Sequence, residues 1–133
     1  MIRITRQVIK DIIDHARSAV PIEACGYLAG ENGIIIKSYP MTNTDNSPEH
    51  FSFDPQEQFE VVRKTRSEGM EIMANYHSHP ATPARPSQED IDLSHDPDIS
   101  YVIVSLAGGR EDVKSFRIIN SDVIIQEIEI IDK

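Results

Sequence analysis

The chain has 133 residues, and its formal charge is −9 because 22 Asp and Glu residues outnumber 13 Lys and Arg residues. This length predicts one domain over residues 1–133 with a sizeable core. The acidic balance argues against nucleic acids and anionic membranes as partners. The single cysteine excludes an intrachain disulfide and a cysteine-rich metal cage. No apolar stretch has the length of a membrane span, so we expect a soluble, cytoplasmic protein.

The first half of the chain predicts two helices around a hairpin. Apolar residues recur at helical spacing from Thr5, a suitable N-cap, to Val20. Residues 26–30 and 34–39 are two apolar runs separated by a turn sequence, which predicts a hairpin. Residues 40–53 are polar and rich in turn formers, so we expect an ordered surface loop there. An Asp-Pro pair then opens a second helix over residues 54–68, which a glycine ends.

The second half of the chain predicts four strands and one short helix. The first strand covers residues 71–79, and the helix runs from Ser87 to about Ser94. Three more strands are expected at residues 101–106, 113–119 and 123–131, with turn sequences between them. This alternation of helices and strands predicts an α/β fold in which helices flank a mixed β-sheet.

Strand 71–79 has apolar residues on both of its faces. Ile72, Ala74 and Tyr76 alternate onto one face, and Met73 falls on the other. A strand with two apolar faces is typical of the centre of a sheet that is covered on both sides. We therefore expect residues 71–79 to be a central strand.

A candidate metal site follows at the end of that strand. His77 and His79 are two residues apart, so their imidazoles point to the same face of the strand. Together with the carboxylate of Asp90 they make a three-ligand set for zinc (Zn²⁺), with a fourth position open, as in catalytic zinc sites. The alternative interpretation is a pair of polar residues at a strand end, since histidine has many roles.

Ser87 and Asp90 also match a capping box, in which the serine caps the helix and the acid reaches back. The two interpretations are compatible. A first-turn position directs the Asp90 carboxylate back toward the histidines, and Ser87 at the cap leaves a hydroxyl beside the metal, where a developing oxyanion could be stabilised.

A catalytic zinc also needs a general base for its water. Glu89 and Asp92 are near in sequence, but both are more typical of a solvated helix face. Glu23 lies at the start of the hairpin between apolar residues. Its spacing alone does not connect it to the metal, so the base stays open at this point.

The remaining polar candidates favour structural roles. Cys25 is either a nucleophile or, more commonly, a small buried residue. His15, His50 and His95 are typical of surface or structural histidines, although His50 could approach the site through its loop. Asn43 is typical of a turn former, with a substrate contact as the alternative.

Taken together, Glu23, His77-x-His79 and Ser87-x-x-Asp90 resemble the signature of the JAMM (MPN-plus, Mov34-type) zinc metallopeptidases. The flanking segments 21–30 and 76–80 are similar to the short prokaryotic branch of that family. The resemblance extends over roughly residues 5 to 125, and no departure is found at the five signature positions.

The resemblance implies a cytidine-deaminase-like α/β fold, the JAB/MPN domain. It implies that His77, His79 and Asp90 are zinc ligands, that Glu23 is the base, and that Ser87 stabilises the oxyanion. It also implies a substrate: the amide or isopeptide bond after the C-terminal Gly-Gly of a small ubiquitin-like or sulfur-carrier protein.

Three alternatives weigh less. RadC-type proteins associated with DNA repair carry a similar set, but their usual loop sequence, His-Asn-His-Pro-Ser-Gly, is absent here. A zinc base deaminase requires H-x-E and P-C-x-x-C, and the chain has one cysteine. A non-catalytic module that binds a ubiquitin-like protein would be marked by loss of Glu23 or of a ligand, and all five residues are present.

Overall fold

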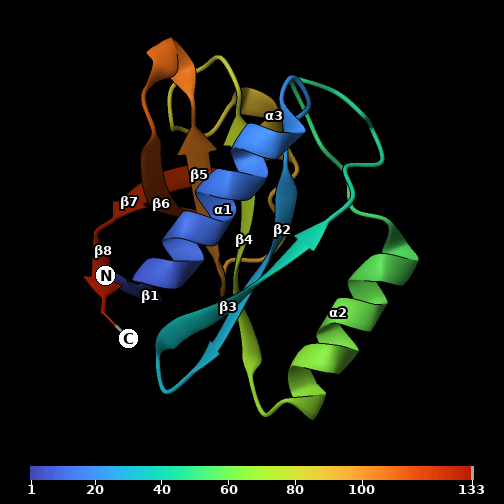
Figure 1. Cartoon of the computed structure of the whole chain (residues 1–133), viewed down its shortest axis with the longest axis vertical. Coiled ribbons are helices and arrows are strands. Elements are labelled where there is room, and N and C mark those ends of the chain that lie inside the picture. Colours follow the sequence, from blue (N-terminus) through green and yellow to red (C-terminus); the bar gives the residue numbers. More distant parts are fainter. Residues whose placement is uncertain (133) are drawn as a thin grey trace.

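A computed structural model describes residues 1–132, and Lys133 lies outside the described residues. The described chain forms one eight-stranded sheet with helices packed against it (Figure 1). The elements in chain order are β1 Ile2–Thr5, α1 Arg6–Ala19, β2 Cys25–Glu31, β3 Ile34–Met41, α2 Pro55–Ser67, β4 Glu71–His79, α3 Gln88–Asp92, β5 Ser100–Ser105, the 3₁₀ turn η1 Ala107–Gly109, β6 Asp112–Ile119, β7 Asp122–Gln126 and β8 Ile128–Ile131.

The sheet is mixed, with strand order β7-β6-β5-β4-β2-β3-β1-β8. β4 is parallel to β5, and β1 is parallel to both β3 and β8, whereas the other neighbours are antiparallel. The predicted α/β fold with a mixed sheet is therefore confirmed. β4 lies inside the sheet, between β2 and β5, so the prediction of a central strand is also confirmed.

Helices α1 and α2 cover opposite faces of the sheet. Leu28 on β2 belongs to the core under α1, together with Val8 and Ile12 of that helix. Its neighbour Tyr27 belongs to a second apolar cluster, against which Val62 of α2 packs. Successive residues of a strand point to opposite faces, so the two helices lie on the two sides of β2. Figure 1 shows α1 in front of the sheet and α2 at its right.

A β-bulge in β4 corrects one prediction. The pairing of β2 with β4 shifts register, from Leu28 opposite Ala74 to Ala29 opposite Ile72, which leaves Met73 as an extra residue. A bulge of this kind reverses the facing of the residues beyond it. Ile72 therefore packs in the cluster under α2, and Met73 packs against the core under α1 that contains Ala74. The prediction that Ile72 shares a face with Ala74, opposite to Met73, was wrong.

The ends of the chain differ from the prediction in a second way. The predicted strand 123–131 is two strands, β7 and β8, and a further strand, β1, precedes α1. β7 and β8 lie at opposite edges of the sheet, although only Glu127 separates them in sequence. The main-chain carbonyl of Glu127 also accepts a hydrogen bond from Ile2. The sheet must therefore curl enough to bring the end of one edge strand close to the start of the other.

The helix boundaries agree with the capping residues. The Thr5 hydroxyl accepts a 3.4 Å hydrogen bond from the Val8 N–H, and α2 follows Asp54 with a proline in its first turn. α3 ends at Asp92, two residues before the predicted Ser94. Within residues 1–132, no helix combines the length and the apolar character that a membrane span requires.

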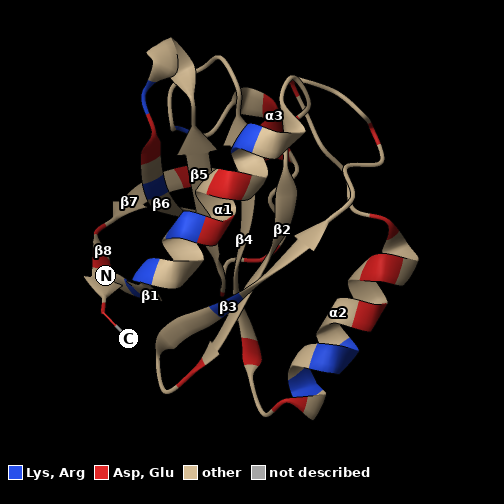
Figure 2. Ribbon diagram, in the orientation of Figure 1, with Lys and Arg blue, Asp and Glu red and all other residues tan. Residues whose placement is uncertain are grey.

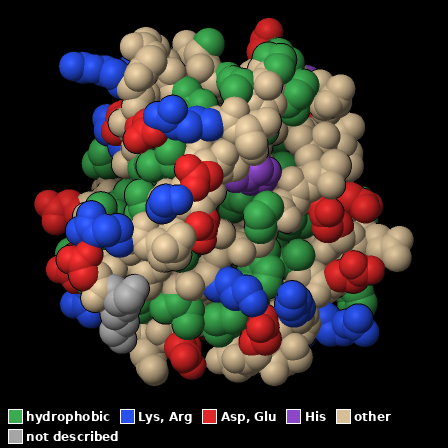
Figure 3. All heavy atoms as spheres, viewed as in Figure 1, with side chains coloured by type: hydrophobic (Ala, Val, Ile, Leu, Met, Phe, Trp, Pro, Cys, Tyr) green, Lys and Arg blue, Asp and Glu red, His purple; other side chains and the backbone are tan. Residues whose placement is uncertain are grey.

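Charged side chains of both signs are distributed along α1 and α2. α2 begins with acidic residues and ends with basic ones (Figure 2), which is the order that the helix dipole favours. On the face seen in Figure 3, acidic and basic side chains lie side by side. Exposed ion pairs such as Lys10–Asp14 and Lys37–Glu68 contribute little to stability in water. The fold is therefore held mainly by its apolar clusters, of which a small third one contains Ala84, Ile103 and Phe116.

Candidate metal centre

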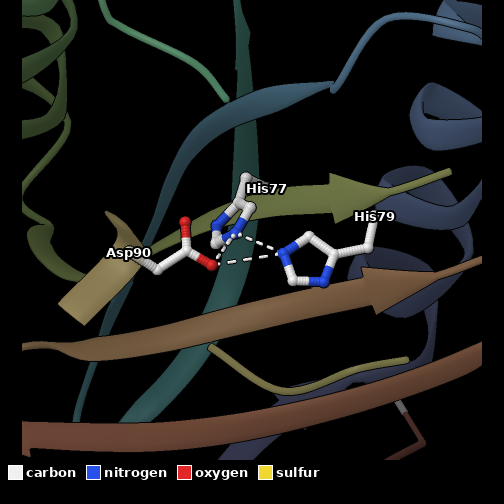
Figure 4. A group of neighbouring side chains, drawn as sticks. All are labelled: His77, His79 and Asp90. Carbon is white, nitrogen blue, oxygen red and sulfur yellow. Dashed lines mark hydrogen bonds and ion pairs between the residues drawn. The ribbon is translucent and has the colours of Figure 1, made fainter. Parts of the chain in front are cut away.

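Three polar side chains converge where β4 ends and α3 begins (Figure 4). The Nε2 atoms of His77 and His79 are 3.1 Å apart. One carboxylate oxygen of Asp90 lies 3.1 Å from the first nitrogen and 3.2 Å from the second. Both histidines are buried, and Asp90 is only partly accessible. The structure thus brings together the three residues that the sequence indicated as metal ligands.

A capping box holds Asp90 in this position. The Ser87 hydroxyl accepts a hydrogen bond of 3.0 Å from the main-chain N–H of Asp90. In return, the carboxylate of Asp90 accepts a hydrogen bond of 2.9 Å from the main-chain N–H of Ser87. The same Asp90 oxygen faces the histidines, so helix capping and presentation of the carboxylate are one arrangement.

The ring of each histidine is fixed by a different neighbour. His79 Nδ1 lies 2.9 Å from the Pro83 carbonyl, which can only accept, so Nδ1 carries the proton and Nε2 has a free lone pair. The His77 ring stacks on Phe51, with ring centroids 4.7 Å apart and planes at 26°. The buried His77 Nδ1 has no hydrogen-bond partner among residues 1–132. Both Nε2 atoms consequently point at Asp90.

The electrostatics of the group are those of a coupled cluster. Burial disfavours the charged form of Asp90, but the hydrogen bonds to His77 and His79 prevail and hold its pKa well below the usual range. Burial lowers the pKa of His77. Burial acts the same way on His79, but the hydrogen bonds to Asp90 and Pro83 outweigh it and raise the His79 pKa. A carboxylate anion therefore faces two imidazoles across about 3 Å, an arrangement that favours a cation.

The donor set fits zinc in type and in spacing. Zinc in proteins takes imidazole nitrogen and carboxylate oxygen at about 2.0–2.1 Å, so tetrahedral ligand atoms lie about 3.3 Å apart. The three edges of the triangle between His77, His79 and Asp90 measure 3.1, 3.1 and 3.2 Å. The group can hold a metal ion with little rearrangement.

Glu23 lies beside the triangle although it is distant in sequence. Cys25 of β2 pairs with His77 of β4 in antiparallel register. The Ser78 N–H donates to the Ala24 carbonyl one step further on, and the same register, continued beyond the end of β2, brings Glu23 opposite His79. The Glu23 side chain is buried, and its Oε1 atom has no hydrogen-bond partner within residues 1–132. Burial raises the pKa of Glu23 to about 8, with smaller effects from nearby charges that include His79 and Asp90. It is a buried carboxyl group close enough to His79 and Asp90 to be affected by their charges.

The comparisons with known proteins identify the family. A family model described as Prok-JAB, prokaryotic homologs of the JAB domain, matches residues 5–119. The chain belongs to the prokaryotic JAB family. This confirms the resemblance noted from the signature residues, and with it the JAB/MPN type of α/β fold.

Relatives of this JAB-family chain support the same assignment. The CysO-cysteine peptidase of Mycobacterium tuberculosis is 35% identical over 133 residues, covering 98% of this chain and 91% of that protein. A desampylase of Pyrococcus furiosus is 31% identical over 91 residues, covering 68% and 65%. Among solved structures, protein DSY2949 from Desulfitobacterium hafniense has a TM-score of 0.90 at 43% identity, covering 100% of this chain and 94% of that one. A JAB1/MPN domain protein from Archaeoglobus fulgidus has a TM-score of 0.66 at 23% identity, covering 96% and 97%, which supports the fold alone.

Other candidate residues of the JAB domain do not belong to the triangle. Cys25 is fully buried, and burial raises the pKa of its thiol to about 12, which argues against a nucleophile. His15 contacts the Tyr76 hydroxyl at 2.7 Å on the α1 side of the sheet. Glu89 and Asp92 are exposed on α3, as expected for a solvated helix face. These positions leave Glu23 as the buried acid of the site.

The loop between β3 and α2 forms one wall of the site, and sequence reasoning underestimated Asn43 at its start. The Asn43 amide donates to the main-chain carbonyls of Glu23 and His50, at 3.1 and 3.0 Å. Its side-chain oxygen accepts from the N–H groups of Asp45 and Ser52, at 3.0 and 3.3 Å. Asn43 therefore joins both ends of the loop to the segment that carries Glu23. The two asparagine-and-serine-rich turns of this loop were the only sequence signal for such a role.

A cavity of about 720 Å³ opens beside the triangle. His77 and Asp90 belong to its lining, as do His50 and Phe51 from the loop. His50 thus approaches the site, as the sequence allowed, and it is paired with Asp45 at 2.9 Å. The cavity gives a substrate direct access to the candidate metal ligands.

Proposed function

We propose that this protein is a zinc-dependent metallopeptidase that cleaves the amide or isopeptide bond after the C-terminal Gly-Gly of a small ubiquitin-like or sulfur-carrier protein. One observation carries the proposal: a buried, unpaired Glu23 carboxyl group lies beside a triangle of two imidazoles and a carboxylate with zinc spacing. Membership of the JAB family and relatives named as peptidases and a probable TtuB-protein conjugate cleaving protease support a hydrolase of this class.

In this proposal His77, His79 and Asp90 hold the zinc. The zinc, when bound, supplies a Lewis acid that lowers the pKa of a water molecule and polarises the scissile carbonyl. The Pro83 carbonyl fixes the tautomer of His79, and the Ser87 N–H fixes the carboxylate of Asp90. These contacts fix the orientation of both ligands.

Glu23 acts as the general base. Its buried carboxyl group accepts a proton from the attacking water and returns the proton to the nitrogen of the leaving amine. Burial raises the pKa of this group above its ordinary value, which makes the carboxylate a stronger base. The Ser47 carbonyl accepts a hydrogen bond from the Glu23 N–H, so the main chain at this residue is held in place.

Ser87 supplies a hydrogen bond to the oxyanion of the tetrahedral intermediate. Its oxygen already accepts from the Asp90 N–H, and its hydroxyl hydrogen has no acceptor in the described chain. The residue is exposed at the start of α3, so a substrate oxygen can reach it. Preorganised donors of this kind are usually a large part of the catalytic effect in acyl transfer.

The test is a panel of small carrier proteins fused through Gly-Gly to a reporter, with matched Ala-Ala junctions. Wild-type protein loaded with zinc should cleave the Gly-Gly fusions only, and a chelator should abolish the cleavage. Glu23→Gln should bind one zinc per chain, as measured by elemental analysis, yet cleave at least about 10²-fold more slowly. Equal cleavage of both junctions, or cleavage that survives the chelator, would contradict the proposal.

A further inference from the structure

Three side chains form a row across the floor of the cavity. Asn75 of β4 pairs with Tyr27 of β2 on one side and with Tyr101 of β5 on the other. Residues paired across neighbouring strands point to the same face of a sheet. All three line the cavity, so its floor consists of two tyrosine rings with a carboxamide between them.

The two tyrosine hydroxyls of this floor already have partners. Tyr27 accepts a hydrogen bond of 2.6 Å from Gln58 on α2. The Tyr101 hydroxyl donates to the Asp96 carbonyl at 3.0 Å and accepts from the Asp96 N–H at 3.1 Å. By contrast, the buried Oδ1 atom of Asn75 has no hydrogen-bond partner among residues 1–132. Among these three side chains, the Asn75 carboxamide therefore carries the polar atom without a partner, and a rotation about its χ2 angle would turn this buried oxygen toward a ligand.

The wall beyond Asn75 contains an apolar stretch, although Arg66 and Glu71 also line the cavity there. Phe53 packs on the Tyr27 ring with centroids 4.9 Å apart. Val62 of α2 and Ile72 of β4 also line the cavity, away from the candidate metal ligands. Because Asn75 precedes His77 by two residues on the same face of β4, the carboxamide lies about 6.6 Å along the strand from that ligand. A chain that extends from the ligands would meet the carboxamide first and the apolar wall next.

These features suit an extended polypeptide. A carboxamide offers one acceptor and an N–H donor, which are the complement of a peptide group. An extended chain advances about 3.3 Å per residue, so Asn75 is level with the second peptide group from the scissile bond. The cavity extends from His77 to Ile72, along several residues of β4. That length suits the tail of a carrier protein better than a small leaving group.

We propose that the Asn75 carboxamide hydrogen-bonds the peptide group that joins the second and third residues before the scissile bond. We also infer that the wall of Phe53, Val62 and Ile72 selects an aliphatic side chain at the third or fourth residue before that bond. This inference rests on the proposed function, because it assigns the cavity to the tail of the same substrate. It makes Asn75 a specificity-determining residue of the chain.

The experiment measures binding separately from cleavage. A fluorescein-labelled peptide, Ala-Ala-Leu-Ala-Gly-Gly-Ala amide, is titrated with zinc-loaded protein carrying Glu23→Gln, which suppresses turnover, and anisotropy gives the affinity. A second peptide has sarcosine in place of the first glycine, which methylates the nitrogen that Asn75 would bind. A third peptide has N-methylalanine at the second alanine, outside that peptide group. Each peptide is titrated with this protein, with the same protein carrying Asn75→Leu, and with the same protein carrying Gln7→Leu on α1 as the control.

The sarcosine peptide should bind about tenfold more weakly than the parent when Asn75 is present, and less than twofold more weakly with Asn75→Leu. N-methylalanine should have the same effect in both proteins, and Gln7→Leu should behave as the parent protein does. Replacing the leucine of the peptide by serine should weaken binding about tenfold. An equal effect of sarcosine with and without Asn75, equal binding of the leucine and serine peptides, or no binding of any peptide would overturn the inference.

The same peptides, given to protein with Glu23 intact, separate this inference from the proposed function. If the peptides are cleaved but sarcosine weakens binding equally with and without Asn75, the position assigned to the tail is rejected and the proposed peptidase activity is unaffected. If sarcosine weakens binding only when Asn75 is present but no peptide is cleaved, the peptidase activity is rejected and the peptide-binding groove is supported. Thermal unfolding shows whether Asn75→Leu folds. If it does not, the sarcosine and N-methylalanine peptides are compared on protein that retains Asn75. This comparison still tests the inference, because only sarcosine should weaken binding strongly.

Discussion

The side-chain amide of Asn43 donates a hydrogen bond of 3.1 Å to the main-chain carbonyl of Glu23. Glu23 lies outside helices and strands, between α1 and β2, so no regular hydrogen-bond ladder holds it. The loop takes over this role from both sides, because the Ser47 carbonyl accepts from the Glu23 N–H. The position of the proposed base is thus set by a segment that begins twenty residues later in the chain.

Asn43→Asp should lower kcat by about tenfold or more while zinc content stays at that of the wild type. The aspartate keeps the oxygen that accepts from Asp45 and Ser52, but it loses the donors to Glu23 and His50. The measurement is steady-state cleavage of a Gly-Gly fusion, together with hydrogen exchange of the loop. A variant with normal kcat and normal exchange would show that the loop does not position Glu23.

Removal of a proposed metal ligand should be visible in the stability of the protein as well as in its zinc content. Zinc at 100 times its dissociation constant should stabilise the wild-type protein by about 2.7 kcal/mol, because it binds the folded state. His77→Ala and His79→Ala should bind little zinc and show no such increase in Tm. Cys25→Ser is the control, since the buried Cys25 is not a proposed ligand, and it should bind zinc normally. Full zinc content in both histidine variants would place the metal elsewhere.

The pKa of Glu23 predicts an unusual dependence of stability on pH in the metal-free protein. Burial raises this pKa from 4.5 to about 8, so the folded state prefers the protonated acid. The resulting stabilisation is present below the unfolded-state pKa and is lost as the pH rises toward 8. Glu23→Gln cannot ionise, so it should become more stable than wild type with increasing pH, by at most about 1.4 kcal/mol per pH unit.

Urea unfolding in chelator at pH 5.5, 6.5 and 7.5 measures this difference. The comparison of the two proteins removes the titration of groups that they share. Glu60→Gln, on the exposed side of α2, is the matched control for a simple change in net charge. A constant difference between Glu23→Gln and wild type over this range would mean that Glu23 titrates normally.

Local sequence patterns predicted most of the fold, and the failures have tertiary causes. β1 has only four residues, and the last of them, Thr5, is the cap of α1, so the strand is too short for an alternating pattern to appear. No turn residue marks the break at Glu127. The break arises because the chain pairs with β6 before this residue and with β1, at the other edge of the sheet, after it. Likewise, nothing local marks the bulge at Met73, which depends on the pairing of β4 with β2.

The candidate site likewise contains some residues that local sequence patterns predict and others whose positions depend on tertiary structure. His77, His79 and Asp90 are close in sequence, so a strand end and a helix start bring them together through local geometry. Glu23 needed the family resemblance, because its place opposite His79 follows from strand pairing. The stacking of Phe51 on His77 depends on how the loop folds back, and no spacing in the sequence predicts it.

Ser78 provides a further test, because it joins the proposed ligands to the proposed base from the opposite face of β4. Its hydroxyl accepts a hydrogen bond of 2.8 Å from the Ala24 N–H, and its own N–H donates to the Ala24 carbonyl at 2.9 Å. Ser78→Ala leaves the Ala24 N–H buried without a partner, which should cost about 1–3 kcal/mol in the free energy of unfolding. It should also lower kcat, since the main chain next to Glu23 loses an anchor, while zinc content is retained.

Ser115→Ala separates this positioning effect from general destabilisation. Ser115 is also fully buried, and its hydroxyl donates to Gln126 at 3.0 Å on β7, away from the cavity. Both variants should lose comparable stability in urea unfolding, but only Ser78→Ala should lose turnover at saturating substrate well below its Tm. Equal kcat in the two variants would show that Ser78 supports the fold alone. A loss of zinc from Ser78→Ala would instead show that the serine acts on the adjacent histidines rather than on Glu23.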